Sequence, residues 1–508
     1  MRALSGLDGA FLHLETPQTP MNVASLHLFD LPPGYAGSFH ERVKRQLAQR
    51  LHLAPIFQQK LAPMPLQFAN PAWIADDDVD LDYHVQRIAL PAPGTQAQLE
   101  ACAAQLHSEL LDRSRPLWRL YVIEGLQSGQ AAYYIKIHHA VLDGQAGVLL
   151  ANALFDLTPA AQPVPKPAGR RRGEHPGPLE LAAAALKHDA GQYIKFVRHL
   201  PDVVRTLAGL VSGARGGAMR GLGTNFAFGP KTPLNVAIGG ERRFAALSVP
   251  LKALKSIAAA HAATLNDVVL ALCSGALRRY LAHHGGIPKK PLIAAMPISL
   301  RAPGDTEFTT QATMSLVNLH THVADPLRRL QAIRDAAGAV KELARRTGGV
   351  MPTDFPSIAV PWVLHGLASL YGRSGIADTI PPIANVTISN VPGPRVPLYA
   401  AGARMATYWP VSIPEHGVGL NITVMSYAGA MGFGFTAAAN AVPDAGPLAT
   451  AVAAALDELL ARTAQAAAKP KRRSASAGRT ARPAGKAAKR TTAGTARTQV
   501  SRAPARGR

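Results

Sequence analysis

Hydrophobic and polar positions follow two different periods along the chain, and these periods alternate. Strict alternation, or short runs of β-branched and aromatic residues, predicts strands at residues 22–31, 119–124, 133–137, 243–249, 292–298 and 384–390, with a hairpin from residue 419. Apolar residues three and four positions apart predict helices at residues 39–51, 95–111, 264–280 and 448–460, and another from residue 251. The alternation of strands and helices predicts an α/β fold.

A stretch of different character separates the two halves of this pattern. Residues 163–240 begin with a segment rich in proline and arginine, continue through a helical stretch and end in a cluster of glycines. We therefore expect an N-terminal lobe at 1–162, a crossover at 163–240, a C-terminal lobe at 241–465 and a tail at 466–508. Apolar and basic residues at 194–198 could lie on a lipid surface or pack against the body, and both interpretations stay open.

The tail carries much of the positive charge of the protein. Residues 469–508 contain 13 lysines or arginines and no acidic residue, so that the rest of the chain carries +9 of the formal net charge of +22. Small and polar residues fill most other positions and cannot build a core, so we expect a disordered basic C-terminal tail. Its expected partner is an anionic membrane or lipid-droplet surface, with non-specific nucleic acid as a further possibility.

Composition bears on the interior and on the compartment. The 508 residues are 47% hydrophobic and 17% charged, which suits two or three domains with large apolar cores. Cys102 and Cys273 lie within helical patterns and indicate a reducing compartment without a disulfide framework. We find no signal-peptide pattern and no segment typical of a membrane span, so we expect a cytoplasmic protein peripherally associated with membranes or lipid inclusions.

The strand at residues 133–137 leads into two adjacent histidines, His138 and His139, followed by Asp143 and Gly144. Helical spacing resumes after Gly144, so the cluster lies in a strand-to-helix turn, where glycine suits tight backbone geometry. A histidine there is a candidate general base, because its ordinary pKa of about 6.5 lies near neutrality. The alternative is a pair of satisfied histidines near the edge of a core. We expect no metal site, since adjacent side chains on a strand point to opposite faces.

The segment HHAVLDG resembles the signature of coenzyme A-dependent acyltransferases of the chloramphenicol acetyltransferase and condensation-domain type. More narrowly, the chain resembles the bacterial wax ester synthase/acyl-CoA:diacylglycerol acyltransferase family from about residue 4 to about residue 460. Three further segments carry the narrower likeness: Pro116-Leu117-Trp118, Asn266-Asp267 and Pro297-Ile298-Ser299-Leu300-Arg301. The resemblance implies two chloramphenicol-acetyltransferase-like α/β lobes joined by a crossover.

The resemblance also implies roles for the residues of the turn. The second histidine, His139, is implied to be the catalytic base, and His138 to pack or hydrogen-bond so that it orients the turn. Asp143 is implied to support the loop through an arginine of the other lobe, for which Arg301 is the matching candidate. Gly144 is expected to support the turn because glycine suits its tight backbone geometry.

The remaining candidate residues each have two interpretations. Pro116-Leu117-Trp118 is implied to lie near the acyl pocket, whereas the residues alone favour Trp118 as a core anchor. Thr264 is a candidate N-cap residue, and Asp267 lies three positions further on, near the positive end of the helix dipole. This helix start explains Asn266 and Asp267 as structural support without catalysis. The donor to the oxyanion is Asn421 or a main-chain N–H near the glycine of the turn.

Together these features predict an O-acyltransferase that moves a long acyl chain from acyl-CoA to diacylglycerol or a fatty alcohol. No cofactor is expected beyond acyl-CoA as substrate, and no acyl-enzyme, because the sequence lacks a G-x-S-x-G elbow. The chain departs from the family at Met21-Asn22, where Met-His is usual, and at residues 309–311, where a Gly-Asn pair is usual; both bear on substrate preference. Two other classes stay open: a condensation-type acyltransferase with a non-lipid nucleophile, and a non-catalytic lipid-inclusion or nucleic-acid-binding protein.

Overall fold

The computed structural model describes residues 2–4, 6–62, 69–141, 151, 154–162, 164–165, 177, 179–183, 186–187, 228–299, 312–347 and 381–468. Residues Met1–Ala466 form one compact unit and residues Ala467–Arg508 a second. Most of the expected crossover and nearly all of the expected tail lie outside the described residues, so the statements about them stay predictions.

The described strands form three sheets. In the first, the strand order is β12 (Tyr399–Ala400), β13 (Ala403–Met405), β2 (Asn22–Asp30), β7 (Ala131–His138), β6 (Trp118–Glu124), β5 (Val85–Ala89), and β14 (Trp409–Val411) also pairs with β2. In the second, it is β10 (Ala312–Asn318), β9 (Ile293–Ser299), β11 (Val386–Val391), β15 (Leu420–Tyr427), β16 (Ala430–Ala438), β8 (Arg242–Pro250). The third is small, in the order β1 (Arg2–Ala3), β4 (Ala72–Ala75), β3 (Gln59–Ala62).

The described α-helices of the first half of the chain are α1 (Gly6–Leu14), α2 (Phe39–Arg50), α3 (Leu81–His84) and α4 (Gln96–Ser108). Those of the second half are α7 (Leu251–Ala260), α8 (Leu265–His283), α9 (Pro326–Thr347) and α12 (Gly446–Ala468). Short 3₁₀ turns lie at Leu51–Leu53, Pro55–Gln58 and His139–Val141, the last directly after β7.

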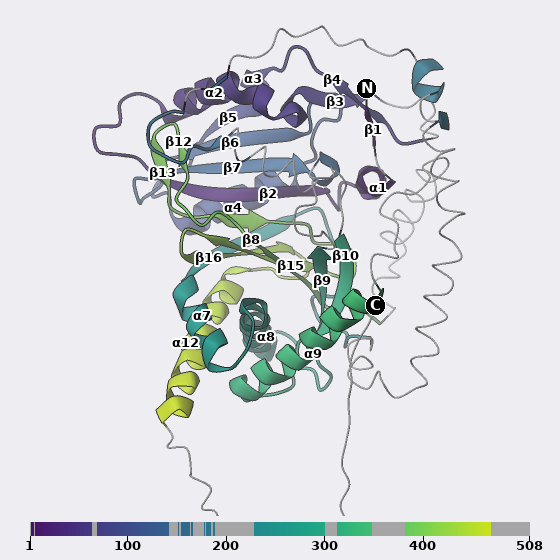
Figure 1. The fold of residues 1–508 in the computed structure, drawn as a ribbon, viewed down its shortest axis with the longest axis vertical. Coiled ribbons are helices and arrows are strands. Elements are labelled where there is room, and N and C mark those ends of the chain that lie inside the picture. The colour runs from purple at the N-terminus through teal and green to yellow at the C-terminus, as the bar shows by residue number, and fades with distance from the viewer. Residues whose placement is uncertain are drawn as a thin grey trace, which may run out of the picture. The chain divides into compact units, whose positions relative to one another are not determined.

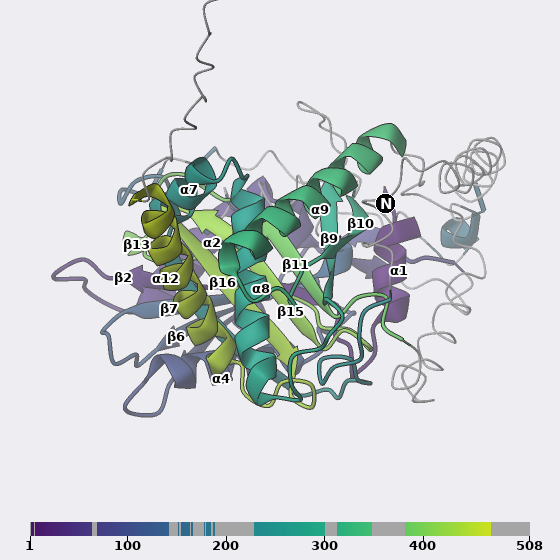
Figure 2. The same cartoon turned by 90° about the horizontal axis from the view of Figure 1, so that it is seen from below.

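Sheets and helices form successive layers (Figure 1). Helix α2 covers the outer face of the first sheet, where Phe39 and Leu47 join the same core as Phe29 of β2. Helix α4 lies between the first and second sheets, and α7, α8, α9 and α12 cover the far face of the second sheet (Figure 2). Each of the two large sheets is thus covered on both faces, which explains why their central strands read as nearly continuous apolar runs.

Helix α4 is held firmly in the layer between the sheets. It begins with a capping box in which Thr95 and Gln98 bond each other's main chain. Its buried residue Leu99 belongs to a core that includes Tyr134 of the first sheet and Phe244 of the second. At its other end, the Nζ of Lys136 donates to the carbonyl oxygens of residues 106 and 109, at 2.6 and 2.9 Å.

Residues 408–412 connect the two large sheets. Strand β14 pairs with β2 of the first sheet, while the Trp409 indole N–H donates to Ser248 Oγ of the second at 2.8 Å. The carbonyls of residues 408 and 410 pass so close to β16 that a Cβ at Gly432 or Gly434 would meet them. The two glycines around Phe433 therefore allow one backbone to cross another.

The structure confirms the α/β class and every strand and helix expected within the described residues, with bounds shifted by one to a few positions and the last helix extended to residue 468. One boundary is different: β12, β13 and β14, at residues 399–411, were expected in the C-terminal lobe but belong to the first sheet. Strands of two or three residues are too short to show an alternation of apolar and polar positions, so the strand with which they pair decides the sheet to which they belong. Among the described residues no single helix is long and apolar enough to cross a membrane, and α7 and α8, bent by 104°, meet those criteria only as a pair.

The crossing of residues 408–412 over β16 gives a first prediction. Gly434→Ala sets a methyl group against the Pro410 carbonyl, and because that obstacle is backbone, the crossing must shift. We expect a loss of roughly 1–3 kcal/mol in unfolding free energy, the usual cost of overpacking, measured by thermal or denaturant unfolding. Gly239→Ala is the control, since a Cβ there meets nothing within 4 Å. Equal stability of the two variants would contradict the close crossing.

Candidate active site

The two histidines lie where β7 ends, and neighbouring strands hold their main chain on both sides. The N–H of His138 donates to the carbonyl of Leu117, at 3.0 Å, and the N–H of His139 donates to the carbonyl of Met21, at 2.7 Å. Strand β7 is buried along its whole length, as its apolar and β-branched composition requires. The pair is therefore fixed to the rigid centre of the first sheet, with the PLW motif on one side and the start of β2 on the other.

Both ring nitrogens of His138 face groups of the protein. Nδ1 accepts the main-chain N–H of Ala140, at 3.1 Å. Nε2 lies 3.3 Å from Oε1 of Glu15, at ion-pair distance although outside strict hydrogen-bond geometry. The residue is completely buried. A substrate hydroxyl therefore has no nitrogen of His138 to reach, which fits the expectation that this histidine orients the turn.

His139 has a different environment. Its ring stacks on that of Phe11 in α1, with centroids 3.9 Å apart and planes at 25°, and the residue is only partly buried. Burial of the imidazole and the nearby His138 lower the pKa of His139 to about 4. Its own main chain opposes this shift, although the buried Nδ1 has no partner in hydrogen-bond geometry among the residues that the structure describes. The imidazole is thus neutral at neutral pH and can accept a proton.

Glu15 is the residue of this site that the sequence analysis missed. Oε1 accepts the main-chain N–H of Met21 at 3.0 Å, and Oε2 accepts two N–H groups of Arg113 at 2.8 and 3.3 Å. Burial alone would raise the pKa of Glu15, but the contacts with His138 and then Arg113 outweigh it and lower the pKa to about 2. No local motif marks this glutamate, because the two side chains that it contacts, Arg113 and His138, come from distant parts of the chain.

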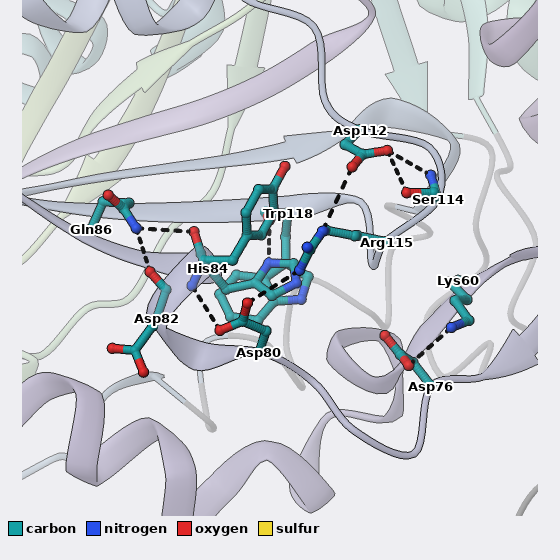
Figure 3. A network of polar contacts seen from close by, with 11 residues as sticks. Lys60, Asp76, Asp80, Asp82, His84, Gln86, Asp112, Ser114, Arg115 and Trp118 are labelled. Atoms are coloured by element: carbon teal, nitrogen blue, oxygen red, sulfur yellow. Dashed lines mark hydrogen bonds and ion pairs between the residues drawn. The ribbon is translucent and has the colours of Figure 1, made fainter.

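The PLW motif lies beside the histidines, because the carbonyl of Leu117 accepts the N–H of His138, and it is packed into the core. Figure 3 shows Trp118 of the motif together with His84. Trp118 is 1% exposed, stacks on His84 with centroids 4.2 Å apart, and its indole N–H donates to the carbonyl of Phe57 at 3.2 Å. His84 Nδ1 in turn donates to the Trp118 carbonyl at 2.8 Å. These contacts make Trp118 a core anchor. Leu117, which accepts from His138, ties the motif to the site, and a part in acyl binding stays a prediction.

A basic surface segment precedes the motif. Arg115 bridges Asp80 and Asp112, at 3.3 and 3.6 Å, and its guanidinium lies over the ring of Tyr83 (Figure 3). The guanidinium of Arg119, directly after the motif, also lies over the ring of Tyr83, 4.4 Å from its centroid. The polar network therefore braces the chain on both sides of the buried tryptophan.

The structure confirms the helix cap expected at Asn266-Asp267. Thr264 and Asp267 form a capping box at the start of α8, with the Thr264 N–H donating to the Asp267 carboxylate at 2.8 Å. Asn266 extends to the second sheet, where its Oδ1 accepts from Asn390 Nδ2 at 3.3 Å. Both residues thus have structural contacts, in agreement with the interpretation of this segment as the start of a helix.

Asn421 and Asn22 both have amides bonded within the protein. Asn421 Nδ2 donates to the carbonyl of Ile413 at 3.0 Å, and its Oδ1 accepts the Thr423 hydroxyl at 2.8 Å. Asn22, which departs from the family pattern, is paired across the sheet with His138 and donates to the carbonyl of Glu109 at 3.1 Å. No hydrogen bond joins Asn421 to either histidine within the described part of the chain, so its role as oxyanion donor stays a prediction.

Three of the candidate residues lie outside the described residues, namely Asp143, Gly144 and Arg301. The same holds for the departure at residues 309–311. Within the described ranges, no group of three or more histidine, cysteine, aspartate or glutamate side chains is arranged to hold a metal ion.

Comparison with known proteins gives the family. The family model of the wax ester synthase/diacylglycerol acyltransferase catalytic domain matches residues 4–269, and that of the C-terminal domain of the same enzymes matches residues 310–460. The chain is 36% identical over 470 residues to a putative diacylglycerol O-acyltransferase of Mycobacterium tuberculosis, covering 91% of this chain and 90% of that protein.

Solved structures agree with the family models. The wax ester synthase/diacylglycerol acyltransferase of Marinobacter aquaeolei matches with a TM-score of 0.65 and 30% identity, over 91% of this chain and 100% of that one. The starter condensation domain of rhizomide synthetase matches with a TM-score of 0.53 at 14% identity, over 91% and 94%, which shows a shared fold alone. The chain belongs to the wax ester synthase/diacylglycerol acyltransferase family of acyltransferases.

Proposed function

We propose that this protein transfers a long acyl group from acyl-CoA to the hydroxyl of diacylglycerol or a fatty alcohol, with His139 as general base. The observation that carries the proposal is the contrast between the two histidines. Both nitrogens of His138 face protein groups, whereas His139 is partly exposed and kept neutral by its surroundings. Family membership supports the substrates, since relatives carry the names diacylglycerol O-acyltransferase and wax ester synthase.

In the proposed reaction His139 accepts the hydroxyl proton while the oxygen forms a bond to the thioester carbonyl carbon. The carbon–sulfur bond then breaks, and His139 returns the proton to the departing thiolate, which leaves as free CoA. Atoms and charge balance without a covalent enzyme intermediate, and the proposal includes no cofactor. The donor to the oxyanion is Asn421 or a main-chain N–H near Gly144.

A panel of acceptors tests the substrate class. Release of CoA from palmitoyl-CoA is followed with hexadecanol, with diolein and with amine or amino-acid nucleophiles. Release with the first two and ester products in the organic phase support the proposal. Release only with a non-lipid nucleophile would instead indicate a condensation-type reaction, and no release with any acceptor would indicate a non-catalytic protein.

A general-base role of His139 predicts that His139→Ala lowers kcat by roughly 10²–10⁴-fold, because the attacking hydroxyl loses its proton acceptor. Turnover with palmitoyl-CoA and hexadecanol measures this effect. His261→Ala is the control, because that histidine bonds Thr463 in the outer layer of the second lobe and should keep full activity. A folded His139→Ala protein with near-normal kcat would refute the mechanism.

The lowered pKa of His139 predicts an unusual pH profile. A base acts in its neutral form, so kcat/KM should hold from neutral pH downward and fall only as the pH passes through about 4, not near the ordinary value of 6.5. The stability of the fold should also depend on pH. Ionised Glu15 stabilises the fold above its ordinary pKa of 4.5, and this stabilisation is lost as the pH falls toward the lowered pKa of about 2. Recovery of activity after return to pH 7 separates titration from unfolding, and a reversible fall centred near 6.5 would contradict the assignment.

We also propose that the basic tail recruits a cytoplasmic enzyme to its insoluble substrate at an anionic membrane or lipid-droplet surface. Each basic residue near an anionic membrane contributes about 1 kcal/mol, and salt weakens the attraction. A protein ending at residue 468 should keep its turnover on detergent-dispersed substrate but bind anionic liposomes much more weakly, with the difference vanishing in high salt. Binding to DNA would be non-specific charge attraction. Loss of detergent-phase turnover on truncation would show that the tail belongs to the catalytic body.

A further inference from the structure

We propose that Glu15 is a positioning residue for the catalytic base. Its carboxylate fixes the ring of His138 and, through the main chain of Met21, the backbone of His139. The inference rests on the proposed role of His139 and adds a residue that neither the histidine motif nor the PLW motif contains.

One carboxylate oxygen holds both histidines. Oε1 of Glu15 accepts the Met21 N–H at 3.0 Å and lies 3.3 Å from His138 Nε2. Met21 passes the constraint on, because its carbonyl accepts the His139 N–H at 2.7 Å. A shift of this oxygen therefore moves the side chain of one histidine and the main chain of the other.

The hydrogen bonds of His138 set its tautomer. Because Nδ1 accepts the N–H of Ala140, that nitrogen carries a lone pair, and the ring proton of a neutral imidazole is on Nε2. Nε2–H then faces the Glu15 carboxylate, whose Oε1 lies at ion-pair distance although outside strict hydrogen-bond geometry. With a neutral group at position 15 this buried N–H loses its anionic partner, and an unsatisfied buried donor is costly.

Arg113 and α1 complete the arrangement. Glu15 is 3% exposed at its side chain, and Arg113, 44% exposed, neutralises it from the solvent side. The same guanidinium donates to the carbonyl of Leu12 at 2.6 Å and so holds the end of α1. That helix carries Phe11, which stacks on His139. Glu15 thus acts on the orientation of His139 by two routes. One runs through the main chain of Met21, and the other runs through Arg113 and α1 to the ring of Phe11.

The alternative is that Glu15 is simply one half of a stabilising buried ion pair. The chain offers a matched control for this, because Arg50 and Asp156 form another buried pair in the first lobe, at 2.6 Å and with both side chains 4% exposed. Asp156 also accepts from Gln46 at 3.1 Å, and among the described residues no contact joins it to either histidine. Asp156→Asn removes a buried charge without touching the site.

The experiment compares Glu15→Gln, Glu15→Asp and Asp156→Asn in the full-length protein. We expect both neutral variants to lower Tm. Only Glu15→Gln should lower kcat, roughly 10–10²-fold as for other residues that orient a functional histidine, with KM for palmitoyl-CoA and for hexadecanol nearly unchanged. Glu15→Asp, which keeps the charge, should recover part of kcat. An equal loss of kcat in Glu15→Gln and Asp156→Asn, or full activity of a folded Glu15→Gln, would overturn the proposal.

A second readout does not depend on turnover. In protein labelled with ¹⁵N-histidine, the Nε2–H proton of His138, assigned by its loss in His138→Asn, should be shifted downfield and exchange slowly with water. It should move upfield and exchange faster in Glu15→Gln, and stay in place in Asp156→Asn. If the Nε2–H signal is unchanged in Glu15→Gln, the contact between His138 and Glu15 is itself overturned. If this signal responds but turnover proves independent of His139, then the proposed mechanism fails and the contact stands.

Discussion

The antiparallel pairing of β2 with β7 is the constraint on which the site depends. Its register sets Asn22 opposite His138, and one step further the N–H of His139 donates to the carbonyl of Met21. Side chains alternate between the faces of a strand, so a slip of one residue would turn every side chain of β7 to the wrong side. The apolar residues that hold this register in the core, such as Leu26 and Tyr134, therefore hold the histidines as well.

The face of β7 that carries His138 also joins the two lobes. Lys136, two residues earlier on the same face, donates to carbonyls at the end of α4, and Asn22 donates to one of them from the neighbouring strand. A cation at a helix C-terminus complements the helix dipole. Since α4 packs against both large sheets, the strand with the histidines is anchored to the layer between the lobes. Residues 408–412 make a second connection, through the glycines of β16.

Local signals in the sequence were enough for part of this structure. The strand that ends at His138 and the capping box of Thr264 and Asp267 depend on residues a few positions apart, and the sequence predicted both. Glu15 and Arg113 could not be found in that way, because they are 98 positions apart and neither lies in a motif. The short strands at residues 399–411 also escaped, since their place depends on pairing with β2 and not on their own period.

The charges of the site give the two adjacent histidines different environments, and the proposed difference in their roles rests on these environments. Glu15 and Arg113 neutralise each other, and both ring nitrogens of His138 face groups of the protein, Nδ1 the N–H of Ala140 and Nε2 the carboxylate of Glu15. In the proposed mechanism, His139 is then the residue, among those described at the site, that accepts the hydroxyl proton. The environment of His139 lowers its pKa and disfavours the imidazolium form at neutral pH. In the proposed mechanism, a positive charge would therefore form there only as the hydroxyl is deprotonated, next to the developing negative charge of the substrate. The proposed division of two neighbouring histidines into a support and a base thus follows from what each ring contacts, in the way that different environments give paired titratable groups different roles.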